Sequence, residues 1–123
     1  MNNEQHILVI DDDDDIGLML KMLLEFKGYR VTVLTRADKI MSVLEKSSFD
    51  LLILDMLIAG ENGCDVCRML KADPAFSHLP ILLFSALPAA RALAMEAGAD
   101  NFIAKPFEMK AMHEKLVSML AKK

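Results

Sequence analysis

The stretch "HILVIDDDDDI", residues 6–16, decides the fold. The apolar run over 6–10 is typical of a short strand that is buried on both faces, and the five aspartates Asp11 to Asp15 follow it directly. Carboxylates this close together repel one another, and some would take up protons unless their charge is offset. Either water and a helix start dissipate the charge, or the site binds a cation.

The rest of the chain alternates between strand-like and helix-like segments. Further strands are expected at 29–35, 49–55, 81–86 and 101–105, and helices at 14–27, 37–47, 63–72, from Pro88 to Gly98, and 107–121. This alternation predicts an α/β fold, a three-layer doubly wound sheet of five parallel strands with five helices. The inward side chains are expected to be Ile16, Met19, Leu20, Leu23 and Leu24 in the first helix and Met112, Leu116, Met119 and Leu120 in the last.

Composition limits the classes of function. The 123 residues fit one domain, 1–123, and 54% hydrophobic with 26% charged residues is typical of a globular chain. A net charge of −4 offers no basic surface, so no direct nucleic-acid binding is expected. No apolar stretch reaches the roughly 18 residues of a membrane span, and the N-terminus lacks signal-peptide features, which favours a cytoplasmic protein.

The cysteines and histidines give little evidence of chemistry. Cys64 and Cys67 spell C-D-V-C, but no second Cys or His pair follows, so both are expected to serve packing on a helix. His6, His78 and His113 are scattered, and surface positions are expected for all three.

Chemistry-bearing residues follow four of the five strands. Asp11 and Asp12 follow the first, Asp55 ends the third, Ser85 ends the fourth and Lys105 ends the fifth. The carboxyl ends of parallel strands meet at one edge, where such sheets bind ligands. Clustered carboxylates suit Mg²⁺, or Mn²⁺ in its place, and Mg²⁺ commonly bridges to phosphate. An aspartate can also attack phosphorus, with the lysine and the metal offsetting the charge.

These residues lie within recognisable motifs. The segments "ILVIDDDDDI", "LLILDMLIAGENG", "FSA" and "AGADNFIAKPF" together resemble a receiver domain of two-component response regulators, of the chemotaxis-receiver kind, over nearly the full chain. The resemblance implies a flavodoxin-like sheet with strand order 2-1-3-4-5. It also implies that Asp55 is the phospho-acceptor, that Asp12 binds Mg²⁺ directly and Asp11 mainly through water, and that Asp55 and the Leu57 carbonyl complete the metal site.

The resemblance extends to the switch residues. Ser85 would be the switch hydroxyl, Lys105 the phosphate-contacting lysine and Phe102 the switch aromatic, and the Lys105–Pro106 bond is often cis in such domains. For Asp13 to Asp15 the residues themselves favour a plainer role at the cap and first turn of a helix.

The implied function is Mg²⁺-dependent transfer of a phosphoryl group from a phosphohistidine, on a histidine kinase or histidine phosphotransfer protein, to Asp55. Such a chain is a signalling phospho-acceptor that catalyses its own phosphorylation and dephosphorylation rather than an enzyme acting on other molecules. It would switch a protein-interaction surface toward an unknown downstream target, near the fourth helix, fifth strand and last helix. The resemblance also allows a homodimer through that face.

Three departures from the family pattern affect these expectations. Ala59 stands where a proline is usual, which predicts a less rigid loop after Asp55 and affects the expected geometry of the Leu57 carbonyl. Gly98 follows Ser85 by only 13 positions, which predicts that either the fourth helix or the loop before it is short. The segment "ALPAARALAMEA", 86–97, is almost uncharged, so it is either a partner interface or alanine-rich packing.

Leu57 and Leu87 flank the expected phosphoryl site by family position, and both are apolar. Neither side chain can orient an attacking water. Slow loss of the phosphoryl group is therefore expected.

Other functions remain open. The first is a binding module that keeps the fold without phosphotransfer. A phosphatase working through an aspartyl-phosphate would need a second carboxylate near the nucleophile, and "MLIA", 56–59, supplies none. A nucleotide-binding enzyme is disfavoured because neither G-x-G-x-x-G nor G-x-x-x-x-G-K-[ST] occurs.

Overall fold

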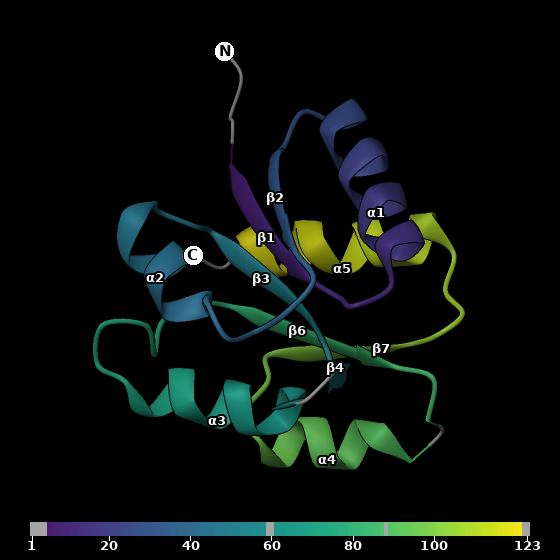
Figure 1. The fold of residues 1–123 in the computed structure, drawn as a ribbon. Helices are drawn as coiled ribbons and strands as arrows, with labels where there is room; N and C mark the ends of the chain where they lie inside the picture. Colours follow the sequence, from purple (N-terminus) through teal and green to yellow (C-terminus); the bar gives the residue numbers. More distant parts are fainter. Residues whose placement is uncertain (1–4, 59–60, 88, 122–123) are drawn as a thin grey trace.

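A computed structural model describes residues 5–58, 61–87 and 89–121. Its main sheet has five parallel strands in the order β2-β1-β3-β6-β7 (Figure 1). Counted over these strands alone, this is the order 2-1-3-4-5, so the predicted fold is confirmed. The strands are β1 His6–Ile10, β2 Arg30–Leu34, β3 Leu51–Asp55, β6 Ile81–Ser85 and β7 Asn101–Ala104.

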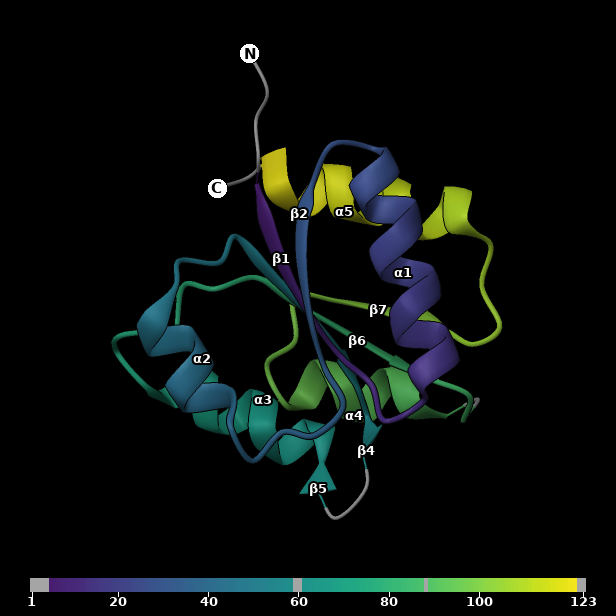
Figure 2. The ribbon, with the colours of Figure 1, turned by 45° about the horizontal axis from the view of Figure 1, so that its top comes forward.

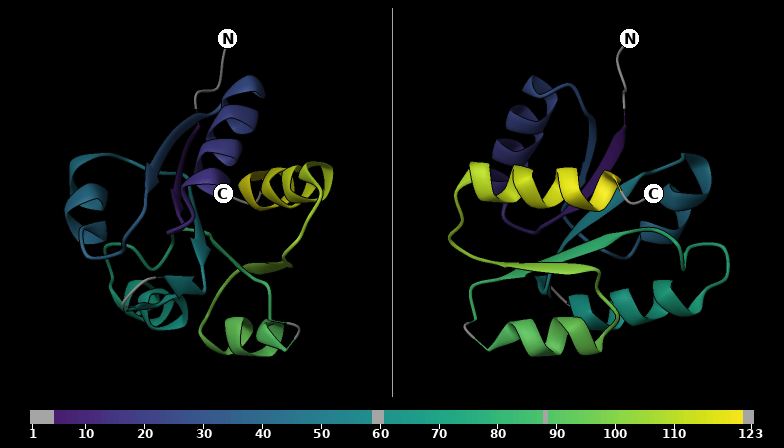
Figure 3. Two further views of the ribbon diagram at one scale, coloured as in Figure 1. Left: turned by 45° about the vertical axis from the view of Figure 1, so that its right-hand side comes forward. Right: turned by 180° about the vertical axis from the view of Figure 1, so that it is seen from behind.

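Helices cover both faces of the sheet, which makes the three layers visible in Figures 2 and 3. One face carries α1 Asp14–Phe26 and α5 Met109–Ala121; the other carries α2 Ile40–Lys46, α3 Gly63–Ala72 and α4 Ala90–Glu96. Each face of the sheet has its own hydrophobic cluster, and alternate residues of β1 point into one or the other. Leu8 lies in the cluster beneath α2 to α4, and Ile7 lies in the cluster beneath α1 and α5. Burial on both faces explains why the strands are unbroken apolar runs.

Three of the five consecutive aspartates begin α1. The side chain of Asp13 accepts hydrogen bonds from the backbone N–H groups of Asp15 at 2.9 Å and Ile16 at 3.4 Å, and Asp14 and Asp15 occupy the first turn. Acidic side chains there interact favourably with the helix dipole. This confirms the prediction that Asp13 to Asp15 lie at the cap and in the first turn of a helix.

The predicted inward face of α1 is partly wrong. Leu20 and Leu24 are buried, but Met19 and Leu23 are each 39% exposed. The apolar residues of this helix occupy more than one face, so periodicity alone misplaced the face that packs. Further exposed apolar side chains on the same helix are Leu18, Met22 and Phe26. In α5, by contrast, all four predicted inward side chains are buried.

Other boundaries differ in small ways. An unpredicted two-stranded ribbon, β4 Leu57–Ile58 with β5 Glu61–Asn62, follows β3; strands of two residues carry no readable period. The helix expected at 37–47 is shorter, because α2 begins only at Ile40. Of the two alternatives predicted for the fourth helix and the loop before it, the helix is short, since α4 has 7 residues. Ala59 and Pro88 lie outside the described residues.

The prediction of a surface position is wrong for His6, which is buried within β1. Its Nδ1 lies 3.2 Å from the Ser48 carbonyl oxygen, so Nδ1 carries the proton and Nε2 accepts from the Thr32 hydroxyl at 2.7 Å. Burial lowers the pKa of His6, and the charge of Arg30 lowers it further. This histidine is therefore held neutral in the folded protein.

The cysteine prediction is confirmed. Cys64 and Cys67 are free, buried and placed on α3, and burial raises the pKa of Cys67 to about 11. Within the residues that the structure describes, no helix is long and apolar enough to cross a membrane.

Candidate functional site

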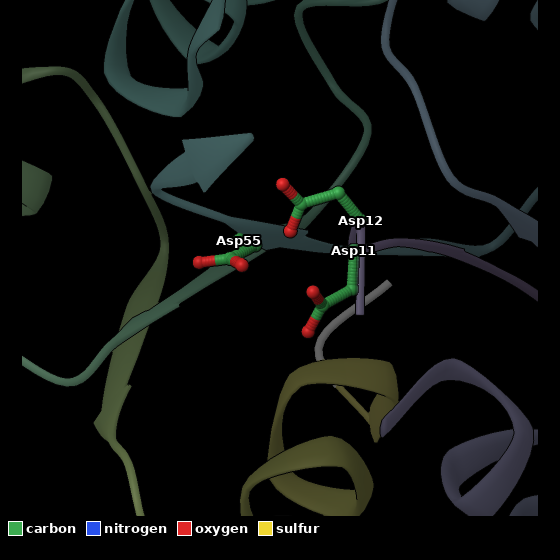
Figure 4. Close-up of side chains that lie close together, drawn as sticks. All are labelled: Asp11, Asp12 and Asp55. Carbon is green, nitrogen blue, oxygen red and sulfur yellow. The ribbon is translucent and has the colours of Figure 1, made fainter. Parts of the chain in front are cut away.

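Three carboxylates meet at the carboxyl edge of the sheet. Asp11 and Asp12 directly follow β1, Asp55 ends β3, and these two strands are neighbours. One carboxylate oxygen from each of the three residues lies within 4.8 Å of the other two. Figure 4 shows the three side chains close together. Asp11 and Asp55 are buried, whereas Asp12 is exposed. Two buried carboxylates with a third toward solvent form a donor set that fits a hard divalent cation.

Lys105, which directly follows the edge strand β7, supplies a positive charge to this group of carboxylates. Its Nζ lies 3.3 Å from Asp11 Oδ2 and 3.3 Å from Asp55 Oδ2, and 4.5 Å from the centre of the Phe84 ring. The backbone N–H of Lys105 donates to the Ser85 carbonyl at 2.8 Å, which fixes the residue beside β6. The Lys105–Pro106 bond is cis, as expected.

The site holds more negative charge than Lys105 offsets. Burial raises the pKa of Asp11 to about 6, and the nearby Asp55 carboxylate adds to the rise. The Asp13 N–H, which donates to Asp11 Oδ1 at 2.9 Å, and the Lys105 ammonium act in the opposite direction. Three carboxylates against one ammonium leave room for the charge of a divalent ion.

The backbone around Asp55 is closely packed. Asp55 Oδ1 accepts the backbone N–H of Leu57 at 3.1 Å, and the N–H of Gly63 donates to the Met56 carbonyl at 2.9 Å. A Cβ on Gly63 would overlap the Asp55 carbonyl oxygen and lie 2.7 Å from Met56 Cα. Gly63 therefore lets the start of α3 lie against the end of β3, next to the acceptor.

The role of Gly63 was missed from the sequence. The available signal was a glycine directly after Asn62, whose side chain caps α3 by accepting the Cys64 N–H at 2.7 Å. The ribbon of β4 and β5 holds Leu57, which pairs with Asn62. The role of the Leu57 carbonyl as a metal ligand stays a prediction.

The two expected switch residues lie in different surroundings. Ser85 ends β6, one residue beyond Phe84, the residue that pairs with Asp55. Ser85 is buried, and its Oγ accepts the backbone N–H of Leu87 at 3.1 Å. Phe102 in β7 is buried in the core cluster that faces α3 and α4. Their switching roles stay predictions.

Comparisons with known proteins agree with this geometry. Residues 7–117 match the family described as the response regulator receiver domain. The DNA-binding response regulator MtrA of Mycolicibacterium smegmatis is 36% identical over 110 residues, which are 88% of this chain and 47% of that protein. The phosphate regulon transcriptional regulatory protein PhoB of Rhizobium meliloti is 31% identical over 116 residues, which are 93% of this chain and 51% of that protein.

The chain thus spans about half the length of these curated relatives. Among solved structures, the signal receiver domain of a signal transduction histidine kinase from Syntrophus aciditrophicus superposes with a TM-score of 0.89 at 28% identity, covering 96% of this chain and 91% of that one. The chain therefore belongs to the response regulator receiver domain family of two-component signalling.

Proposed function

We propose that this chain is a single receiver domain that accepts a phosphoryl group on Asp55 from a phosphohistidine of a histidine kinase or a histidine phosphotransfer protein. The observation that carries the proposal is the placement of Asp55 between the half-buried ammonium group of Lys105 and two further carboxylates at the sheet edge. A nucleophile, a charge-offsetting ammonium and an oxygen donor set for a metal are the parts that phosphoryl transfer needs.

The chemistry follows from these groups. A carboxylate oxygen of Asp55 attacks phosphorus while the phosphorus–nitrogen bond to the donor imidazole breaks. The ring nitrogen keeps the electron pair, and Asp55 holds the acyl phosphate. The ammonium of Lys105, already 3.3 Å from Asp55 Oδ2, lies where it can contact a phosphoryl oxygen. The chain catalyses its own modification by positioning and electrostatics.

The acidic cluster would hold Mg²⁺, with Mn²⁺ as a substitute. Asp12 and Asp55 would bind the ion directly, Asp11 mainly through water, and the Leu57 carbonyl would be the remaining protein ligand. The bound ion would neutralise the carboxylates and the phosphoryl oxygens. The buried position of Asp11 against Lys105 supports its indirect role.

Phosphorylation would act on the protein surface through Ser85 and Lys105. In the structure, Ser85 Oγ accepts from Leu87 N–H, and the Leu87 carbonyl accepts the N–H of Ala90, the first residue of α4. A phosphoryl oxygen on Asp55 offers the Ser85 hydroxyl a new acceptor. Drawing Ser85 and Lys105 inward would shift the loop before α4 and the face of α4, β7 and α5, with Phe102 following.

That face would bind a downstream protein, and it is also one surface through which two copies could join. The proposed setting is the cytoplasm, with no direct contact to nucleic acid. Leu93 and Met95 on α4 are exposed, whereas Ala90 and Ala94 are buried. The almost uncharged segment 86–97 therefore provides both alanine packing and exposed apolar side chains.

The test is the intact mass of the protein after incubation with acetyl phosphate, with and without Mg²⁺. A gain of one phosphoryl group that requires Mg²⁺, is absent in Asp55→Asn and persists in the exposed control Asp65→Asn would support the proposal. If folded protein gains nothing and also fails to bind beryllofluoride, the chain is instead a receiver-fold binding module without phosphotransfer.

A further inference from the structure

Helix α1 has a second apolar face that neither the core nor the phosphorylation site uses. Leu18, Met22 and Phe26 are 57%, 61% and 87% exposed, and Met19 and Leu23 lie beside them. These five residues, called the α1 stripe below, recur at spacings of three and four residues, so they line one side of the helix. Leu20 and Leu24 on the other side supply the core contacts.

The shape of the α1 stripe suits another helix. Asp15, Leu18, Met19, Met22 and Leu23 line a shallow groove of about 360 Å³. The stripe spans Leu18 to Phe26 within the 13-residue helix, so it runs for about two and a half turns, or about 13 Å. Apolar side chains at three- and four-residue spacing form the ridges that interlock with those of a facing helix. Continuous exposed apolar surface of this kind marks an interaction site.

Charge at the two ends of the stripe indicates the occupant. Asp14 and Asp15 are exposed at the first turn, and Lys27 and Arg30 are exposed just past the last one. In the middle, Lys21 pairs with Glu25 on the same helix at 2.5 Å. The complement is therefore an apolar helix whose basic end meets Asp15 and whose acidic end meets Lys27. A second α1 that runs antiparallel has this pattern, whereas a parallel copy would oppose like charges.

We propose that two copies of this chain associate through their α1 stripes, antiparallel and about a twofold axis near Met22. Asp15 of each copy faces Lys27 of the other, and the contact is isologous. One helix pair buries less than the roughly 800 Å² per partner of a standard interface, so the dimer is weak and reversible. This inference does not depend on phosphotransfer.

The dimer would also cover one approach to the phosphorylation site. Met19 belongs to the α1 stripe and also lines an apolar groove of about 440 Å³ with Ile16, Pro106 and Lys105. Since the Lys105 ammonium contacts Asp55, self-association would restrict access from this side.

The first experiment is sedimentation of the whole, unphosphorylated chain over a concentration series. The wild type is expected to show a monomer–dimer equilibrium, and Met22→Glu or Leu18→Glu to weaken it at least tenfold with unchanged circular dichroism. Met69→Glu, at an exposed position on α3, is the matched control and should leave the equilibrium unchanged. A monomeric wild type, or a dimer that Met95→Glu on α4 disrupts and Met22→Glu does not, would overturn the proposal.

A charge swap tests the antiparallel arrangement. Asp15→Lys alone and Lys27→Glu alone should each weaken association, because each places like charges face to face. The double variant should recover it, and so should an equimolar mixture of the two single variants, whose opposed charges are again unlike. Failure of the mixture to associate would rule out antiparallel pairing. If the wild type stays monomeric while Met22→Glu slows transfer from a phosphohistidine donor but not from acetyl phosphate, the donor occupies the stripe instead.

Discussion

Asparagine in place of Asp11 should stabilise the metal-free protein at neutral pH and remove most of its response to Mg²⁺. The Asp11 side chain is fully buried, and its pKa rises from 3.8 to about 6, mainly through burial. The difference between 6 and 3.8, at about 1.4 kcal/mol per pKa unit, gives about 3 kcal/mol of unfavourable charge burial. This difference already includes the attraction of Lys105. The asparagine amide adds buried N–H groups that need acceptors, which offsets part of the gain, so a net gain of about 1–2 kcal/mol is expected.

The pH dependence of stability should show that the Asp11 charge is unfavourable in the folded state. Unfolded Asp11 loses its proton near pH 3.8, whereas folded Asp11 keeps it to about pH 6. Between these values the folded state binds more protons, so the Asp11 contribution to stability falls as pH rises through this window and is constant above it. The advantage of Asp11→Asn should therefore be small near pH 4 and complete at pH 7.5.

The assay is urea unfolding at both pH values in EDTA, repeated with Mg²⁺. Binding to the folded state should stabilise the wild type and have little effect on Asp11→Asn. Asp14→Asn, at an exposed position in the first turn of α1, is the control and should change stability by less than about 0.5 kcal/mol. If Asp11→Asn is less stable than the wild type in EDTA at pH 7.5, the ion pair with Lys105 outweighs charge burial and the reasoning is wrong.

Three further outcomes are expected. Gly63→Ala should destabilise the fold by about 3 kcal/mol in urea unfolding, because the added carbon meets the backbone of Asp55 and Met56; equal stability to the wild type would show that α3 can shift freely. Leu57 and Leu87 are 57% and 48% exposed, and replacing both with asparagine should speed loss of the phosphoryl group about tenfold. An amide can orient the attacking water, and a tenfold faster rate corresponds to an activation barrier lower by about 1.4 kcal/mol. An unchanged decay of the phosphorylated mass would contradict that role. His6 is buried and its pKa is lowered below 6.5, so its contribution to stability is present above pH 6.5 and is lost as pH falls below it. His6→Val should remove that component from the pH profile of the urea midpoint, and identical profiles would refute the assignment.

The alternation of strands and helices and the meeting of the main candidate site residues could be predicted from chain order, whereas the strand order 2-1-3-4-5 came from the resemblance to receiver domains. Asp11, Asp12, Asp55 and Lys105 each stand at the end of an apolar run. In a parallel sheet all such ends lie at one edge, so knowing the strands was enough to bring these residues together. The helix cap at Asp13 is equally local, since its hydrogen bonds reach only to Asp15 and Ile16.

The tertiary structure decided which neighbours each residue meets. Periodicity marked the apolar residues of α1, but only docking on the sheet selected Leu20 and Leu24 for the core and left Met22 and Phe26 exposed. The burial of His6 likewise depends on loops and strands distant in sequence. At Gly63 the deciding contact is with the backbone of Asp55. The pattern along the chain shows which side chains are apolar. Whether such a side chain is buried depends on another element that packs against it, and the position of that element is set only when the helices pack against the sheet.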